Sequence, residues 1–276
     1  MDKTMNESGL KGRKRKGAVA VVGFGPGNLD DMTFRAAKAI TSADLVIGYK
    51  TYIDILREYF PDAAFHSNAM TKEVERCEYA LDEALSGKQI ALVSSGDSGV
   101  YGMAGLLLEI VARRGLTEDQ LTVEIIPGVT AASSAAALLG APLMHDFAVI
   151  SLSDLMTPLD TIWARVKAAA EADFVICIYN PKSRKRATYL AKSCEIIARS
   201  RPADTPCGIA SHVGRSEETV ITTTLADLPN QDVDMFSIVI IGNSQTKIEN
   251  GKLLTPRGYE EKYLNLTHDK AGREQK

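Results

Sequence analysis

Apolar stretches alternate with amphipathic stretches along the first half of the chain. The apolar run Ala18 to Val22 predicts a buried strand, and the segment LDDMTFRAAKAI after it carries the acidic residues and the threonine typical of a helix start. Further strands are expected at 44–47, 89–95 and 122–128, and helices at 52–59, 71–86, 100–113 and 130–140. Strands that alternate with helices predict a mostly parallel sheet covered by helices.

The alternation stops at GAPLMHDF, residues 140–147, and then starts again. Strands are expected at 148–152 and 173–180, and helices at 159–170 and 183–199. After them, ETVITTTL (218–225) alternates β-branched residues with no helix before it, and SIVIIG (237–242) follows. Because such strands form hairpins, this half predicts a mixed sheet. The predicted fold class is α/β, with two α/β domains, a mostly parallel sheet in the first and a mixed sheet in the second.

The length of 276 residues is enough for two domains of ordinary size, and 45% hydrophobic residues can fill two cores. We expect a disordered basic leader (1–17), an N-terminal α/β domain (18–143), a C-terminal α/β domain (144–265) and a polar tail (266–276).

Charge and composition argue against several classes of protein. The net charge of −3 does not suggest a nucleic-acid binder, and no apolar run reaches the roughly 18 residues of a membrane helix. The first residues lack the apolar core of a secretion signal, so we expect a cytoplasmic protein without a membrane or nucleic-acid partner. The four cysteines, Cys77, Cys177, Cys194 and Cys207, occur singly, which predicts buried thiols and no metal site.

The glycine-rich segment GFGPG after the first strand is not a dinucleotide-binding turn. That turn needs glycine at the first, third and sixth positions, and Gly23 and Gly25 fit, but Asn28 stands at the sixth. It also needs an acidic residue near the end of the second strand, where this chain has Gly48, Tyr49 and Lys50. An NAD-dependent oxidoreductase is therefore poorly supported.

Four loops follow predicted strands, at the strand ends where open α/β sheets bind ligands: GFGPG, SSGDSGVYG, IIPGVTAA and IYNPKSRKR. In the second loop, Asp97 is the one fixed negative charge, and it could bind a ligand's ammonium or ribose hydroxyls, or cap the helix expected from Val100. In the third loop, Thr130 could cap its helix or contact a ligand. Taken singly, these loops leave both interpretations open.

In order, the four loops resemble a known family. The succession V-x-G-x-G-P-G, G-D-x-x-x-Y-G, I-P-G-V-T-A-A and I-Y-N-P, spread over residues 18–245, is similar to the tetrapyrrole methylases, the class III methyltransferases that use S-adenosylmethionine. The resemblance implies a homodimer of two-domain chains, with the methyl donor in a cleft between the domains and S-adenosylhomocysteine as its product.

Within this family, IGYKTYIDIL (47–56), SSGDSGVYGMAG (94–105) and IYNPKSRKR (178–186) resemble the C(17)-methyltransferase branch of cobalamin (vitamin B12) biosynthesis. Ser98 stands where many sister enzymes have proline. The branch implies methylation of precorrin-3B, or of its cobalt-containing counterpart, at C-17 with associated ring contraction. Cobalt would then enter only as part of the substrate, if at all.

The resemblance also implies which residues form the site. The donor would be bound by Pro26, Ser95, Gly96, Asp97, Val100, Thr130, Ala131, Tyr179, Asn180 and Gly214. Ring contraction needs a proton donor or acceptor. The candidates for that catalytic role are His212, Asp97 and Tyr101, with His66 and His145 as further histidines. The substrate's carboxylates would pair with Lys50, Lys182, Arg184 and Lys185, although the basic run that also holds Arg186 could be a solvated helix start.

Other functions remain open at this point. A sister methylase acting at another tetrapyrrole position would share the donor site. A methylase of the same fold acting on protein or ribosomal RNA is less favoured, because RNA recognition uses aromatic residues and only 6% of this chain is aromatic. From a different class, the chain could be a ligand-binding sensor without catalytic activity.

Overall fold

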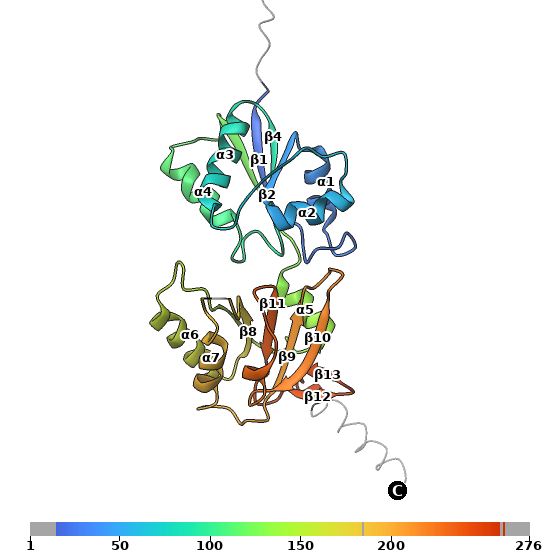
Figure 1. Cartoon of the computed structure of the whole chain (residues 1–276), viewed down its shortest axis with the longest axis vertical. Helices are drawn as coiled ribbons and strands as arrows, with labels where there is room; N and C mark the ends of the chain where they lie inside the picture. The colour runs from blue at the N-terminus through green and yellow to red at the C-terminus, as the bar shows by residue number, and fades with distance from the viewer. Residues whose placement is uncertain (1–14, 184, 260–261, 263–276) are drawn as a thin grey trace, which may run out of the picture. The chain divides into compact units, whose positions relative to one another are not determined.

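The computed structural model describes residues 15–183, 185–259 and 262, and the chain divides into two compact units after Thr130 (Figure 1). The division falls earlier than the boundary expected after residue 143. The reason is the small-residue helix Ala131–Leu139, which packs on the sheet of the second unit. The predicted leader and tail fall almost wholly outside the described residues.

The first unit is built on a five-stranded parallel sheet in the order β3-β2-β4-β1-β5. Its strands are β1 (Gly17–Gly23), β2 (Leu45–Tyr49), β3 (Phe65–Asn68), β4 (Gln89–Ser94) and β5 (Leu121–Ile126). Its helices are α1 (Phe34–Ser42), α2 (Lys50–Tyr59), α3 (Glu73–Leu85) and α4 (Ala104–Arg113). The mostly parallel sheet predicted for this half is confirmed.

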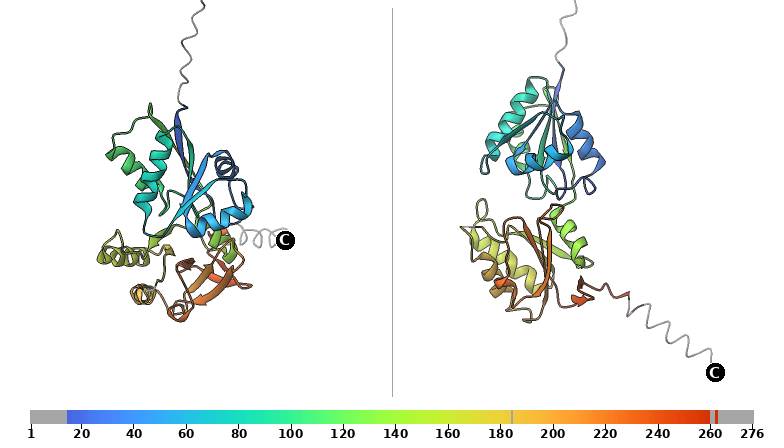
Figure 2. Two further views of the ribbon diagram at one scale, coloured as in Figure 1. Left: turned by 45° about the horizontal axis from the view of Figure 1, so that its top comes forward. Right: turned by 45° about the vertical axis from the view of Figure 1, so that its right-hand side comes forward.

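Both faces of this sheet are covered, which explains its continuous apolar strands. Val19 and Val21 of β1 pack beneath α3 and α4, whereas Val22 packs with α1 and α2 on the other face. Figure 1 shows the two helix pairs on opposite sides of the sheet, and Figure 2 shows the same layers from two further directions. Helix α1 begins after Thr33, whose hydroxyl accepts a hydrogen bond from Ala36 N at 3.1 Å, as a capping threonine does.

The second unit has a mixed sheet in the order β10-β9-β11-β8-β7, so the predicted mixed sheet is also confirmed. Its strands are β7 (Phe147–Ser151), β8 (Val175–Tyr179), β9 (Pro206–Ser211), β10 (Thr219–Thr224) and β11 (Ser237–Ile241). Only β7 and β8 pair in parallel, and the other neighbours are antiparallel. Helices α6 (Leu159–Glu171) and α7 (Tyr189–Ile197) cover one face, and α5 (Ala131–Leu139) packs on β9, β10 and β11.

Strand direction brings several chain segments to one edge of this sheet. Because β9 and β8 both run antiparallel to β11, the ends of β7, β8 and β9 meet the start of β11. At the start of β11, Ser237 lies beside Ser211, the last residue of β9. This edge, which we call the carboxyl edge of the second sheet, holds the segments after Ser151, Tyr179 and Ser211.

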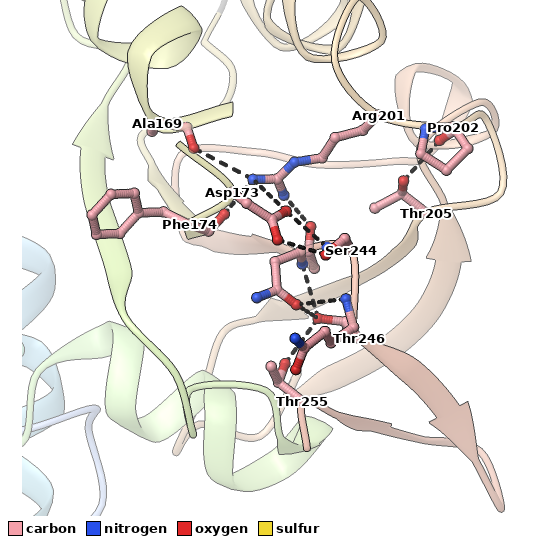
Figure 3. Close-up of polar contacts among 12 residues, drawn as sticks. Ala169, Asp173, Phe174, Arg201, Pro202, Thr205, Ser244, Thr246 and Thr255 are labelled. Carbon is pink, nitrogen blue, oxygen red and sulfur yellow. Dashed lines mark hydrogen bonds and ion pairs between the residues drawn. The ribbon is translucent and has the colours of Figure 1, made fainter. Parts of the chain in front are cut away.

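The opposite edge is held by a buried arginine (Figure 3). Arg201 is 5% exposed, and its guanidinium donates to the backbone oxygens of Ala169, Phe174 and Gly242, with Asp173 at 4.0 Å. Burial lowers the pKa of Arg201 from its usual value. These bonds tie the end of α6 and the start of β8 to the end of β11. Arg201 therefore has a structural role in this unit.

Two helices begin later than their sequence pattern predicts. Helix α4 begins at Ala104 rather than Val100, because residues 98–103 form a turn that is closed by a bond from Ala104 N to Ser98 O (3.0 Å). Helix α7 begins at Tyr189 rather than Ser183.

Some short strands were not predicted. The four-residue strand β3 has no fully buried residue and no clear alternation. A small sheet joins β6 (Gly140–Ala141), β12 (Lys247–Glu249) and β13 (Lys252–Leu254). The turn between β12 and β13 has Asn250 and Gly251 at φ +51° and +75°. Asn-Gly is a strong hairpin signal, and it would have predicted this pair.

Candidate functional site

The carboxyl ends of β1 and β4 form a topological switch point. The two strands are neighbours, but β1 leads to α1 on one face of the sheet and β4 leads to α4 on the other. The loops after them therefore diverge, and open α/β sheets bind ligands where such loops diverge. The donor residues expected in the first two loops, Pro26, Ser95, Gly96, Asp97 and Val100, all lie here.

Glycines let the loops after β1, β4 and β5 pack directly on one another. Gly25 and Gly96 exchange backbone hydrogen bonds of 3.1 and 2.7 Å. A Cβ atom at Gly23 would lie 2.6 Å from Gly96 O, and one at Gly128 would lie 2.2 Å from the same oxygen. The glycines of GFGPG and IIPG thus allow the loops to pack closely on one another. This packing explains the glycines without a dinucleotide ligand.

The Asp97 carboxylate is bound by backbone amides from two loops. Gly99 N donates to Oδ1 at 2.7 Å, and Gly128 N donates to Oδ2 at 3.0 Å. Asp97 does not cap a helix starting at Val100, which was one of the two alternatives left open by the sequence, because α4 starts only at Ala104. Asp97 instead holds the second loop to the third.

Two serines at the carboxyl edge of the first sheet have different roles. Ser98 is fully buried, and its hydroxyl lies 3.2 Å from Val21 O and 3.4 Å from Ile126 O, so it bridges the ends of β1 and β5. Ser94, the last residue of β4, is 6% exposed, and its hydroxyl has no hydrogen-bond partner among the described residues. A buried hydroxyl without a partner fits a site completed by a polar ligand. Sequence reasoning missed Ser94, although a serine that ends an apolar strand is a readable signal.

Three predicted site residues have strained backbones. Tyr101, Asn180 and His212 have φ of +54°, +51° and +53°, a left-handed conformation that non-glycine residues seldom adopt. Tyr101 is also 58% exposed, in the loop after β4. Asn180 and His212 directly follow β8 and β9, at the carboxyl edge of the second sheet. Such strain is concentrated at functional sites.

The remaining predicted donor residues lie at the start of α5 and at this carboxyl edge. Ala131 is the first residue of α5, and the next amide, Ala132 N, donates to the hydroxyl of the buried Tyr179 at 2.8 Å. Asn180 Nδ2 donates to Ser151 Oγ at 3.0 Å. Gly214, two residues after His212, has a φ of +72°. Thr130 is the last residue of the first unit.

His212 forms an ion pair or hydrogen bond with an aspartate that sequence reasoning did not single out. His212 Nε2 lies 3.0 Å from Asp234 Oδ2. Asp234 Oδ1 accepts from Ser237 Oγ (2.8 Å) and from Phe236 N (2.9 Å). No local motif announces Asp234, because the pair depends on how β9 and β11 are aligned.

The other two histidines are not at these edges. His66 lies in β3 with its ring 4.3 Å from the ring of Tyr79 on α3, so it belongs to the packing of that helix. His145 is exposed and precedes β7, at the amino end of that strand.

The predicted substrate-binding lysines differ in their surroundings. Lys50 makes an exposed ion pair with Asp54 at 2.8 Å, a kind of pair that contributes little to stability. Lys182 is half-buried and Lys185 is exposed, and Arg184 lies outside the described residues. Arg186 turns inward, with its guanidinium 3.0 Å from Ser153 Oγ.

Arg186 also lies 3.6 Å from Asp154, which accepts a hydrogen bond from the Tyr189 hydroxyl at 2.8 Å. That hydroxyl, followed by smaller effects that include Arg186, lowers the pKa of Asp154.

Among the described residues, no group of three or more His, Cys, Asp and Glu could hold a metal ion. Nor does any described helix have the length and apolar character needed to cross a membrane. All four cysteines are buried and unpaired, as predicted.

Comparison with known proteins assigns the chain to a family. Residues 18–229 match the model of the Tetrapyrrole (Corrin/Porphyrin) Methylases. A "Probable cobalt-factor III C(17)-methyltransferase" of Salmonella typhimurium is 48% identical over 241 residues, which cover 87% of this chain and 99% of the relative. A "Precorrin-3B C(17)-methyltransferase" of Sinorhizobium sp is 37% identical, with 88% and 97% covered. The solved structure of the methyltransferase CobJ matches with a TM-score of 0.81 at 33% identity, covering 87% of this chain and all of that one.

Proposed function

This chain belongs to the tetrapyrrole methylases, and we propose that it transfers a methyl group to C-17 of a corrinoid precursor in cobalamin biosynthesis. The observation that carries the proposal is the similarity, over most of the chain, to two relatives named for C(17) methylation. The first relative is named for cobalt-factor III and the second for precorrin-3B, so either acceptor is a candidate here. We include the associated ring contraction in this proposal.

We propose S-adenosylmethionine as the methyl donor, which supplies an activated methyl group when bound. The switch point of the first sheet fits a polar ligand, because the buried hydroxyl of Ser94 has no hydrogen-bond partner within residues 15–183, 185–259 and 262. Pro26, Ser95, Gly96, Asp97, Val100 and Thr130 of the first unit would bind the donor, and Ala131, Tyr179, Asn180 and Gly214 of the second unit would contribute further contacts. Most of these contacts would be to the backbone, which the packed glycine loops and Asp97 hold in place.

No nucleophilic side chain is needed for this reaction. Alignment of the acceptor carbon with an activated methyl group can lower a barrier by about 7–11 kcal/mol. The four buried cysteines agree with this, because burial raises the pKa of Cys77, Cys177 and Cys194 to about 12 and keeps them as thiols. The rigid loops of this chain would therefore act by positioning.

Purified protein incubated with S-adenosylmethionine and either precorrin-3B or cobalt-factor III tests the function. Mass spectrometry should show the gain of one methyl group, and NMR of the product should place it at C-17. Gain with only one acceptor would also establish whether the substrate contains cobalt. Methylation at another ring position would identify a sister enzyme, and donor binding without turnover on any tetrapyrrole would favour a sensor.

We propose that Lys50, Lys182, Arg184 and Lys185 bind the carboxylates of the substrate. Lys185 is exposed and Lys182 is half-buried, so a polycarboxylate can reach both. Changing Lys182 and Lys185 together to alanine should raise the KM for the tetrapyrrole and leave S-adenosylhomocysteine binding unchanged. Lys167→Ala, on helix α6, is the matched control. An equal KM in the double variant and in Lys167→Ala would contradict the substrate-binding role of Lys182 and Lys185.

We also propose a homodimer, because the family resemblance implies one, and a cytoplasmic location. Light scattering of the purified chain should give twice the mass of 29.8 kDa, and a mass equal to that of one chain would refute the dimer. Cell fractionation tests the compartment.

A further inference from the structure

The second unit holds a histidine and an aspartate in a fixed hydrogen-bonded pair. His212 follows β9, and Asp234 lies just before β11, so the two meet at the carboxyl edge of the second sheet. Ser237 Oγ and Phe236 N occupy Asp234 Oδ1, which leaves Oδ2 facing His212 Nε2 at 3.0 Å. The carboxylate is therefore held by three hydrogen bonds, one of which goes to the imidazole.

The imidazole itself is held from several sides. Its ring centroid lies 5.3 Å from that of Phe236, and His212 N donates to Phe236 O at 3.2 Å. The backbone at His212 is left-handed, with φ of +53°. Glycine adopts that conformation without steric cost, so a histidine here indicates a use for its ring.

The pair determines which ring nitrogen carries the proton. An ionised carboxylate only accepts hydrogen bonds, so Nε2 must be the protonated nitrogen when the ring is neutral. Nδ1 then presents a lone pair, and no described residue is recorded as hydrogen-bonded to it. The side chain of His212 is 28% exposed, so the ring is not sealed in the core.

We propose that His212 Nδ1 accepts the proton that the acceptor macrocycle loses when it is methylated, and that Asp234 is the positioning residue for His212. This inference rests on the proposed function. Methyl transfer from a sulfonium forms a C–C bond, breaks a C–S bond and leaves a neutral thioether, so the positive charge passes to the acceptor. Loss of one proton from the acceptor to Nδ1 restores its charge and gives an imidazolium, which the Asp234 carboxylate stabilises.

Charged groups that face His212 come from two segments. Asp234 approaches from the segment before β11, while Arg215, Glu217 and Glu218 lie in the turn after β9. The Arg215 guanidinium stacks on Phe236 at 5.0 Å, and Glu218 accepts a bond from Gly214 N. The pKa of Glu217 is lowered, chiefly by a hydrogen bond from Ser216. Of these described groups, only Asp234 hydrogen-bonds to the ring.

The first test measures the tautomer without substrate. Nitrogen-15 NMR of histidine-labelled protein should show His212 protonated at Nε2 in the wild type and in the control Asp232→Asn, whose exposed carboxylate lies two positions from Asp234. In Asp234→Asn the ring should become a mixture of tautomers. A wild-type ring protonated at Nδ1 would overturn the proposal, whatever the activity of the protein.

The second test measures methyl transfer. Asp234→Asn should lower kcat by about 10-fold or more, and His212→Asn by about 10²–10⁴-fold, with S-adenosylhomocysteine affinity unchanged. A kcat in Asp234→Asn equal to that of Asp232→Asn would overturn the role of Asp234.

Ser237→Ala is the second variant, because it keeps the carboxylate and removes one bond that orients it. Ser237→Ala should lower kcat, but by less than Asp234→Asn does. An unchanged kcat would contradict the positioning role even if Asp234→Asn failed to fold. If the wild type methylates no tetrapyrrole, the proposed function fails. The tautomer measurement still decides whether Asp234 fixes the proton of His212 on Nε2.

Discussion

Cys77, Cys177, Cys194 and Cys207 show how surroundings decide the chemistry of a single residue. All four are buried, and burial raises the pKa of the first three to about 12 and that of Cys207 also upward. A thiol without a charged partner is inert in such surroundings. His212 is the contrasting case, since a carboxylate and a ring contact hold it while none of the described residues hydrogen-bonds to its second nitrogen.

Because the four thiols are buried, we expect the folded state to lose stability at alkaline pH. A thiol whose pKa is raised by folding stabilises the folded state fully below its unfolded pKa of about 8.5–9, and this stabilisation is lost as the pH rises toward its folded value. From pH 8 to pH 10, each thiol should lower the free energy of unfolding by about 1–2 kcal/mol. Urea unfolding of Cys177→Ala, which lacks one thiol, should show a correspondingly smaller loss than the wild type. Equal losses would mean that Cys177 does not contribute.

Elements are arranged here so that loops from distant parts of the sequence can touch. The loops after β1, β4 and β5 pack through Gly23, Gly96 and Gly128, and Asp97 bonds across them. The sequence predicted the strands before these loops because their apolar runs are local. It misplaced the start of α4, because the turn that delays the helix depends on a bond to Ser98 O.

Gly128→Ala tests the packing of these loops. Its Cβ would lie 2.2 Å from Gly96 O and 2.4 Å from Gly23 O, so the loops must separate, and we expect a loss of about 2 kcal/mol or more in stability together with loss of donor binding. Gly105→Ala on α4 is the control, since a Cβ there has no neighbour within 4 Å. Because alanine favours helix, that variant should be neutral or more stable by about 0.5–1 kcal/mol. Thermal unfolding and calorimetric titration check both, and unchanged donor binding in Gly128→Ala would contradict the role of these loops.

At the scale of the whole molecule, the two units have different sheets. The first sheet, all parallel, has a topological switch point where the buried hydroxyl of Ser94 has no hydrogen-bond partner among the described residues. The second, mixed, brings His212 and Asp234 together at one edge and uses Arg201 to hold the other. Family membership and the named relatives give the reaction that these parts would serve.

Binding of the donor's product should stabilise the whole protein. A ligand that binds only the folded state at about 100 times its Kd adds about 2.7 kcal/mol. S-adenosylhomocysteine should therefore raise the melting temperature in a concentration-dependent way, whereas NADH should not. A shift with NADH alone would revive the dinucleotide interpretation that Asn28 argues against.

The sequence by itself determined the order and type of most strands and helices, the difference between the two sheets and the family. Local periodicity sets the first two, and an ordered series of short motifs sets the third. Only the tertiary structure decided that Asp97 binds Gly128, that the Ser94 hydroxyl has no partner in the described part of the chain, and that His212 meets Asp234, 22 positions away. Those contacts depend on strand order and register, which bring together residues that no local pattern relates.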